Sequence, residues 1–461
     1  MKYCDRPFRH MYILPDGRVR SCGWTDGTIG NLIEQDIEEI WHGERAERQR
    51  DAIRNGSFSF CRKTSCPFLE NDSLPDISEE EFREKTVTPA LPDDFSVSCD
   101  YVCNHSCPSC REKVFVGSKE YTQNVELMID KLLPYLNKAG HVSTDGNGDA
   151  FASPSIMRML KDLHPENENC TIGIETNGVL FNESNWEKIK HLGAYGLSVT
   201  VTPNSFVPST FRYLNGGHDT YDKLIHNLYF IKELRQKGQL NYYNISMVVQ
   251  DRNFMELPEF AERCINDFCV DRVTVKPLYH WFGLSEDLYW HKDILNPMHP
   301  YHQEYMEILK SPILQHEKVF FWGADNLHDS RPHPAYKYLE QLEMVTTCME
   351  DPDLSDKIQK YFQDQNIKSC YIYGDEKLSS FVYGILKNEL EIKGFMARDI
   401  CREEICGVPV KCIWDYKPSN EDNIIVINYK YFQTIRRDFD LIGFTGNLIP
   451  LDSFIQSIGN F

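Results

Sequence analysis

The stretch FSVSCDYVCNHSCPSC, residues 95–110, decides which fold and which chemistry we expect of this chain. It opens with a short apolar run and continues into a loop that carries Cys99, Cys103, Cys107 and Cys110. The last three have the spacing Cys-x3-Cys-x2-Cys. Three thiolates on one tight loop can hold three irons of a cubane cluster and leave the remaining iron open, as catalytic metal sites do. A zinc site built from these four cysteines is the alternative.

Around this loop, apolar runs alternate with helical patterns. The runs with strand character are Phe95–Ser98, His141–Thr144, Thr171–Glu175, Leu197–Val201, Tyr243–Val249 and Arg272–Lys276. Residues 125–138 and 221–234 have apolar residues at helical spacing, with Leu127 among those expected on the buried side. This alternation implies an α/β fold with a parallel sheet, and six units suit a partial (β/α)6 barrel of TIM type over residues 93–285. Reactive residues should follow the strand ends, and the cysteines do.

Composition narrows the choice of partners. The chain has 461 residues and a formal net charge of −20, which disfavours nucleic acid and anionic membranes as partners. No run approaches the ~18 to 20 apolar residues of a membrane helix, and the first residues lack a signal-peptide pattern. We therefore expect a cytoplasmic protein. Its 16 cysteines should then be reduced, and clustered cysteines in that compartment more often bind metal than form disulfides.

Further motifs follow the next strands in order. STDGNGDAFASP, at residues 143–154, contains Gly146, Asn147, Gly148 and Asp149. Thr176 and Asn177 come after the third run, and Thr200 lies within the fourth. Glycines let the backbone approach a ligand closely, and an acidic side chain favours an ammonium group. Together with the cysteine triplet, these segments resemble the radical SAM superfamily.

That resemblance implies a mechanism and a set of ligands. Cys103, Cys107 and Cys110 would bind a 4Fe–4S cluster whose open iron is chelated by S-adenosylmethionine (SAM). The residues that would position SAM are Gly146, Asn147, Gly148, Asp149, Thr176, Asn177 and Thr200. Reductive cleavage would give a 5′-deoxyadenosyl radical that abstracts hydrogen from a substrate. The resemblance also implies oxygen sensitivity and a reducing partner such as flavodoxin or ferredoxin.

A second cysteine set lies before the barrel, in residues 1–75. Asp16-Gly17 predicts a hairpin turn, and an amphipathic pattern follows at residues 37–56. The pieces PF, DGRVRSC, IGN and EEIW, with the closing cysteine pair, resemble a SPASM or twitch module. By that resemblance, Cys4, Cys22, Cys61 and Cys66 would bind an auxiliary 4Fe–4S cluster, and a four-cysteine zinc site is the alternative. Residues 76–92 read as a linker.

The remaining segments are less specific. Residues 286–345 connect the barrel to the end of the chain and could cover the substrate. In and just before this segment, the candidate pocket or loop residues are His280, Trp281, Trp290, His291, His299 and His302. Residues 346–461 resemble a small Rossmann-like α/β domain, but only Gly374 of a glycine-rich motif is present, so a docking role is as well supported as nucleotide binding. Asp399 could meet a ribose or cap a helix. We expect Cys401, Cys406 and Cys412 to be ordinary thiols.

The sequence therefore predicts an oxidoreductase of the radical SAM type. The auxiliary module favours a peptide or protein substrate, and the C-terminal domain favours a sugar or nucleotide-linked one. Dehydrogenation, epimerisation and cross-linking all stay open. The rival from another class is a non-catalytic zinc-binding scaffold or interaction protein that keeps a degenerate barrel.

Overall fold

The chain folds into two sheets, one of ten and one of six strands among the described residues. The computed structural model describes residues 1–25, 27–62, 66–70, 72–111, 113–279, 286–322, 345–346, 348–374, 377–397, 403–415, 419, 421–427 and 432–458. Within these residues, no helix combines the length and the apolar character that crossing a membrane requires. His280, Trp281, Asp399 and Cys401 lie outside the described residues.

The larger sheet has the strand order β10-β9-β8-β7-β6-β5-β4-β1-β2-β3. Neighbouring strands from β10 to β1 are parallel throughout. Their bounds are β4 (Asp94–Val97), β5 (His141–Thr144), β6 (Thr171–Thr176), β7 (Gly196–Val201), β8 (Tyr242–Val249), β9 (Arg272–Pro277) and β10 (Val319–Phe321). The six predicted strands are therefore present within a residue or two, and β10 adds a strand from the segment 286–345 that we expected only to connect.

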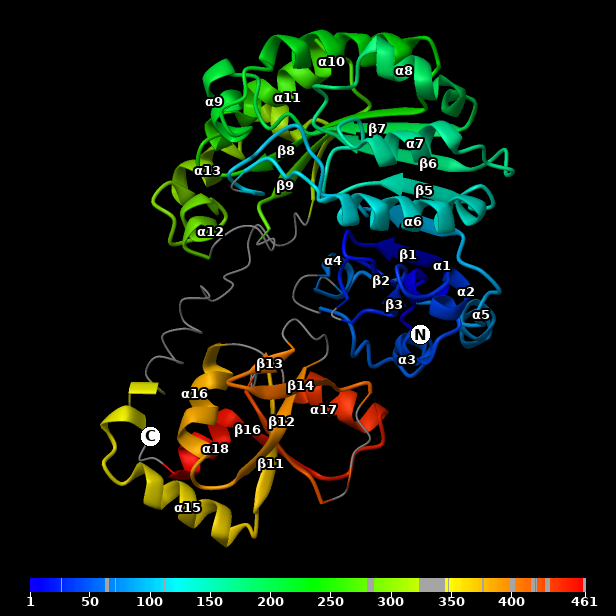
Figure 1. Ribbon diagram of the computed structural model, residues 1–461. Helices are drawn as coiled ribbons and strands as arrows, with labels where there is room; N and C mark the ends of the chain where they lie inside the picture. The colour runs from blue at the N-terminus through cyan, green and yellow to red at the C-terminus, as the bar shows by residue number, and fades with distance from the viewer. Residues whose placement is uncertain are drawn as a thin grey trace.

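Helices join the successive parallel strands and lie on the outside of the curved sheet (Figure 1). They are α6 (Lys119–Leu136), α7 (Pro154–Asp162), α8 (Glu183–Ile189), α9 (Pro208–Leu214), α10 (Tyr221–Gln236) and α11 (Leu257–Asn266), followed by α12 (Glu286–Lys292) and α13 (His302–Ile308). Helix α6 begins earlier than predicted because the Ser118 side chain accepts a hydrogen bond from the Tyr121 backbone and caps it. Its buried stripe runs through Val125 and Met128, and Leu127 is 40% exposed, so its predicted burial is wrong.

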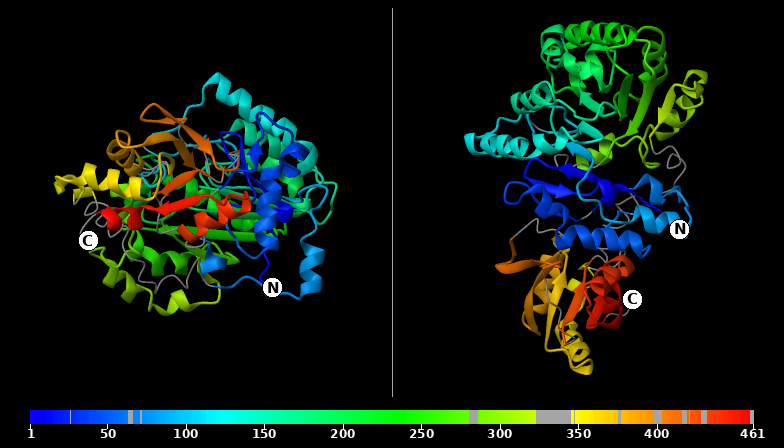
Figure 2. Two further views of the ribbon diagram at one scale, coloured as in Figure 1. Left: turned by 90° about the horizontal axis from the view of Figure 1, so that it is seen from below. Right: turned by 90° about the vertical axis from the view of Figure 1, so that its right-hand side faces the viewer.

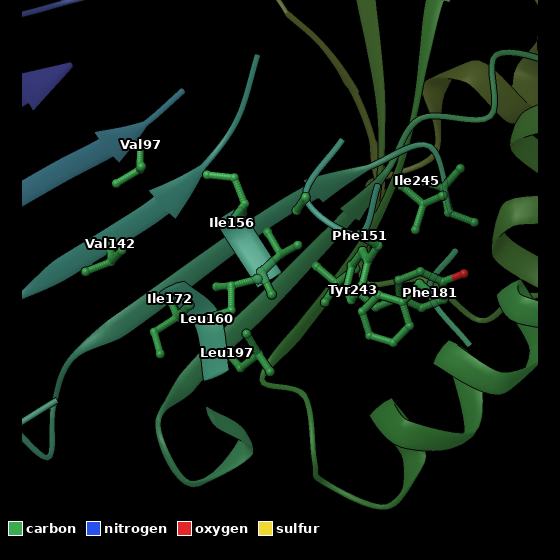
Figure 3. Packing of buried hydrophobic residues seen from close by; sticks show 14 of the residues in the cluster. Val97, Val142, Phe151, Ile156, Leu160, Ile172, Phe181, Leu197, Tyr243 and Ile245 are labelled. Carbon is green, nitrogen blue, oxygen red and sulfur yellow. The ribbon is translucent and has the colours of Figure 1, made fainter. Parts of the chain in front are cut away.

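The main hydrophobic core lies between these helices and the sheet. Alternate strand residues point to the helices, as Val142, Ile172 and Leu197 show on three adjacent strands (Figure 3). Helix α7 packs on them through Ile156 and Leu160. The other strand residues, such as Ser143 and Thr200, are polar and only half-buried. This alternation leaves a hydrophilic inner face, as the period of two residues in a strand requires.

The N-terminal module, residues 1–75, extends the same sheet. Its elements are α1 (Arg6–Arg9), β1 (His10–Ile13), β2 (Arg18–Arg20), β3 (Gly30–Asn31), α2 (Ile37–Trp41), α3 (Glu44–Arg54) and α4 (Pro67–Glu70), and α5 (Glu79–Lys85) follows in the predicted linker. Strand β1 forms the predicted hairpin with β2 and pairs in parallel with β4. A buried polar chain crosses this seam, because His10 Nε2 lies 3.0 Å from Ser96 Oγ, which lies 2.9 Å from Ser143 Oγ.

The smaller sheet belongs to the C-terminal part of the chain. Its order is β13-β14-β12-β11-β15-β16, and every neighbouring pair except β13–β14 is parallel. The strands are β11 (Ser369–Tyr373), β12 (Glu391–Ala397), β13 (Glu404–Ile405), β14 (Val408–Cys412), β15 (Asn423–Val426) and β16 (Asn447–Pro450). The helices are α15 (Leu354–Asp364), α16 (Lys377–Leu386), α17 (Phe432–Leu441) and α18 (Leu451–Ile458). The N-terminal module lies between this sheet and the rest of the larger one (Figures 1 and 2).

Candidate functional site

The cysteine loop, residues 99–111, leaves the C-terminal end of β4, as predicted. Cys103 and Cys107 are partly buried and Cys110 is exposed. A turn joins the last two, because the Cys110 backbone donates to Cys107 O at 2.8 Å. Burial raises the pKa of Cys103 to about 11 and that of Cys107 to about 12. The nearby Cys110 thiol adds to the rise in both pKa values. The three thiols therefore lie within electrostatic reach of one another.

Cys99 has a different environment from the other three cysteines. It is fully buried and belongs to the main hydrophobic core. Burial raises the pKa of its thiol to about 12. Its side chain is therefore packed among apolar groups, and the loop offers three thiols to a metal centre.

Hydrogen bonds join the cysteine loop to the segment between α9 and α10. The Ser106 backbone donates to Asn215 O at 3.3 Å, and His105 Nε2 lies 3.2 Å from Thr220 Oγ1, just before α10. A Cβ on Gly216 would lie 2.3 Å from Ser106 O, so this close approach requires glycine. The loop thus spans the C-terminal ends of the intervening strands.

The motif turn, residues 145–149, lies beside the loop. Asp149 is buried and accepts hydrogen bonds from Asn177 N at 2.7 Å and Thr176 Oγ1 at 2.8 Å. Asn177 Nδ2 in turn donates to Asn104 Oδ1 at 2.8 Å and lies 3.8 Å from Cys103 Sγ. Three of the predicted cofactor residues are therefore joined to the first cysteine of the triplet.

The other predicted residues are placed less directly. Gly148 packs under the cysteine loop, since a Cβ there would lie 2.5 Å from Val102 O. Asn147 donates to Ser98 Oγ at 3.1 Å from its backbone and from its side chain. Thr200 lies on β7 beside Glu175 and accepts a hydrogen bond from Asn244 at 3.3 Å. Thr200 therefore differs from the other predicted cofactor residues, because its hydrogen bond comes from the neighbouring strand β8 and not from the motif turn.

Arg111 is a site residue that sequence reasoning missed. Its guanidinium donates to Asn147 O and to Tyr101 O, and Nη2 lies 3.6 Å from Cys110 Sγ. A cation at this distance stabilises a thiolate, and the same side chain ties the cysteine loop to the motif turn. Its position directly after the last cysteine was the available signal.

A small cavity opens at the motif turn. Its lining includes Ser98, Asp145, Asp149 and Glu175. Lys276 on β9 pairs with Glu175, with 3.1 Å between Nζ and Oε1. Burial, and next the charge of Glu175, raise the pKa of Asp145 to about 7. The cavity is polar, and sequence reasoning passed over Asp145 although it stood next to the glycine-rich motif.

The second cysteine set is gathered by the N-terminal module. Cys22 Sγ accepts from the Trp24 backbone at 3.4 Å, and Thr25 forms an isolated antiparallel bridge with Cys61. Burial raises the pKa of Cys4 to about 12, and the neighbouring thiols Cys22 and Cys66 add to this rise. Cys4 and Cys61 pack against one apolar cluster. The four predicted ligands, far apart in sequence, are thus brought to one region.

The spread of the thiols bears on which metal centre they could hold. Among the described residues, no three His, Cys, Asp or Glu side chains surround one point closely enough to hold a single metal ion. In an iron–sulfur cube each thiolate binds its own iron, so the ligands lie further apart than those of one ion. Three thiols on one loop and four in the N-terminal module are donor sets that fit such cubes.

The C-terminal domain contacts the N-terminal module next to Cys61. Phe60 and Trp414 pack with 4.3 Å between ring centroids, and both are almost fully buried. Arg48 Nη1 donates to Trp414 O at 2.7 Å, and Arg45 pairs with Asp415 at 2.6 Å. The side of α3 is therefore a contact surface for the loop that follows β14.

The candidate aromatic and histidine residues after the barrel have local roles. His299 Nε2 lies 3.2 Å from His291 O, and His302 Nδ1 lies 3.0 Å from Ile294 O. Trp290 packs edge-on against Tyr289. Cys406 is exposed and Cys412 is buried in the C-terminal core. These contacts agree with the prediction that such residues are ordinary loop or core residues.

Comparison with known families agrees with this arrangement. The Radical SAM superfamily model matches residues 98–264, and the model of the SPASM iron-sulfur cluster-binding domain matches residues 4–67. The chain therefore contains a radical SAM domain and a SPASM domain. Its radical SAM domain implies a 4Fe–4S cluster and SAM as cofactors, and its SPASM domain implies auxiliary iron–sulfur binding.

Solved structures with some similarity to the chain include two of SuiB from Streptococcus suis, one of them bound to S-adenosylmethionine. They share 16% and 14% identity with the chain, cover 61% and 63% of it, and have TM-scores of 0.34. The chain spans 62% and 64% of those SuiB chains. Methylornithine synthase (PylB) shares 11% identity over 55% of this chain and 81% of its own, with a TM-score of 0.27. No curated protein matches the chain.

Proposed function

We propose that this protein is a radical SAM enzyme that reductively cleaves SAM and abstracts a hydrogen atom from a polar substrate. When bound, the cluster supplies the electron that breaks the sulfonium bond and releases the 5′-deoxyadenosyl radical. The observation that carries the proposal is the grouping of Cys103 and Cys107 with Cys110 on one loop, while Cys99 is buried in the core. The loop itself then supplies three ligands to four irons, which leaves one position for SAM.

The surrounding residues have distinct roles in this proposal. Arg111 holds the cysteine loop against the motif turn and favours the thiolate form of Cys110. Asp149 fixes Asn177 beside Cys103 through its backbone and Thr176. With Gly146, Asn147, Gly148 and Thr200, these side chains and backbone groups would surround SAM. The partial barrel formed by β4 to β9 would enclose the reaction.

The N-terminal module would hold the auxiliary cluster through Cys4, Cys22, Cys61 and Cys66. Trp24, two residues after Cys22, contacts Tyr279 at the end of β9 with 5.4 Å between ring centroids. The auxiliary site therefore borders the end of the barrel strands, where an electron could pass between it and the substrate. Such a cluster has four thiolates and no open iron, which suits electron transfer.

The substrate class rests on the polar inner face of the sheet. Ser143 and Thr200 lie on this face, and Lys276 pairs with Glu175 at the ends of their strands, so a polar substrate fits better than an apolar one. We propose a peptide or protein, or a sugar or nucleotide-linked compound. The C-terminal domain, with its five parallel strands, would be a Rossmann-like recognition or docking domain. A low-potential donor such as flavodoxin or ferredoxin would supply the electron.

Anaerobic reconstitution tests the proposal. We expect a brown protein with about eight irons per chain, since each site would hold one cube. Incubation with SAM and a strong reductant should release 5′-deoxyadenosine, measured by chromatography. A colourless protein with stoichiometric zinc and no 5′-deoxyadenosine would instead identify the zinc-binding scaffold.

A further inference from the structure

The side chain of Tyr12 extends from the N-terminal module to the motif turn. Tyr12 lies on β1 and is paired in register with Ser96 on β4. A Cβ on Gly146 would lie 3.0 Å from Tyr12 Oη and 2.7 Å from Ser98 Oγ, so both hydroxyl groups press against this turn. Gly146 also has a φ of +88°, which a side chain would strain. The conformation of the turn thus depends on a residue outside the barrel.

The same turn presents two buried oxygens that lack a hydrogen-bond partner in the described part of the chain. They are Thr144 Oγ1 and Asp145 Oδ1, and both residues line the cavity. Thr144 is only 3% exposed. Buried polar atoms in native proteins are almost always hydrogen-bonded, so two such atoms beside one cavity indicate that a bound group completes them.

The charges around Asp145 indicate what that group is. Lys276 is engaged by Glu175, with 3.1 Å between Nζ and Oε1. Burial disfavours the ionised form of Asp145, and the negative charge of Glu175 disfavours it further. Lys276 and Arg6 also act on Asp145, but each is paired with another carboxylate, Glu175 and Asp94, and neither donates to Asp145 Oδ1. A hydrogen-bond donor, best a positively charged one, would therefore stabilise Asp145.

We propose that Asp145 accepts a hydrogen bond from a donor group of SAM, its ammonium or a ribose hydroxyl, and that Tyr12 is the positioning residue by which the N-terminal module holds this turn in place. The inference rests on the proposed function, because it takes SAM as the ligand. It differs from the family-based prediction for Asp149, whose carboxylate already accepts three hydrogen bonds from Phe151, Thr176 and Asn177.

The test uses SAM binding to the full, anaerobically reconstituted chain, measured by calorimetry. Asp145→Asn should weaken binding about tenfold or more, the range for a charged hydrogen bond, and Tyr12→Phe should weaken it about two- to tenfold. Tyr135→Phe is the matched control, because it removes another hydrogen bond between the barrel and the N-terminal module, 3.1 Å from Tyr135 Oη to Glu38, at a distance from the turn. It should bind SAM as the wild type does.

Two smaller probes separate the donor groups. 5′-Methylthioadenosine keeps the ribose hydroxyls, and methionine keeps the ammonium. If Asp145→Asn loses affinity for only one of the two probes, the donor is the group that this probe carries. Wild-type affinity for SAM in both Asp145→Asn and Tyr12→Phe overturns the inference. The iron content and the SAM-induced change in the EPR spectrum are recorded in parallel, so a wild-type protein without clusters would count against the proposed function instead.

Discussion

The two cysteine sets differ in how the chain assembles them. Cys103, Cys107 and Cys110 lie within eight residues on one loop, which Ser106 ties to Asn215. Cys4 and Cys66 lie more than sixty residues apart and meet only through the fold of the N-terminal module. A local set depends on one loop, whereas a dispersed set depends on everything that packs around it. The comparison predicts that distant contacts affect the second set more than the first.

The largest effect should come from the local set. Cys107→Ser removes a ligand that no neighbouring residue can replace, since Cys99 is packed in the core. We expect iron to fall from about eight to about four atoms and 5′-deoxyadenosine formation to fall below detection. Cys269→Ser, at an exposed thiol, is the control and should change neither quantity. Retained cleavage in Cys107→Ser would contradict the ligand assignment.

The dispersed set should give a separable loss. Cys22→Ser should also reduce iron to about four atoms, because one thiolate of the auxiliary cube is removed. The EPR change on adding SAM should persist, since it reports on the other cluster. Loss of that change in Cys22→Ser would show that the two sets do not act as separate centres.

An intermediate effect is expected at the contact between domains. Phe60 and Cys61 are adjacent, and Trp414 packs on Phe60 at 4.3 Å. Trp414→Ala should leave a cavity beside Phe60 and so loosen Cys61. We expect a chelator to extract the auxiliary irons several-fold faster, with Trp414→Phe close to the wild type. The catalytic cluster in the same protein is the internal control, and equal acceleration of both would contradict the comparison.

The smallest effect concerns pH. Asp145 has its pKa raised to about 7 by burial and by Glu175, with Asp94 adding and Lys276 and Arg6 opposing. Tyr12 also faces this carboxyl, and its own pKa is raised by burial and by Asp145. A raised pKa means that the carboxyl gains its charge only as pH rises through about 7. SAM affinity should therefore increase several-fold between about pH 6 and 8, and Asp145→Asn should flatten this profile.

Local sequence signals predicted the strands and the motif order, because both depend on residues close in the chain. The six strands and the Cys-x3-Cys-x2-Cys loop were found this way. The pairing of β1 with β4 was not, since it joins segments some eighty residues apart and strand partners are a tertiary property. Strand β10 was missed for a related reason: three residues in an aromatic-rich segment give no periodic signal.

The site was predicted to a similar extent. Motif resemblance identified Asp149 and Asn177, which the structure joins to Cys103. Arg111, Asp145 and Tyr12 are absent from that list because their roles follow from where three separate segments meet. A guanidinium after a cysteine or an acid before a glycine has many ordinary uses, and only the folded structure shows which residues surround each of them.

The shared ladder between β1 and β4 has a consequence for protein engineering. Trimming the first 75 residues to obtain a minimal barrel would uncover the backbone groups of β4 along its whole length. Bare strand edges recruit other chains and lead to aggregation. A shortened version would therefore need a substitute strand or charged edge residues, and poor yield from a simple truncation would reflect that exposed edge instead of a missing cofactor.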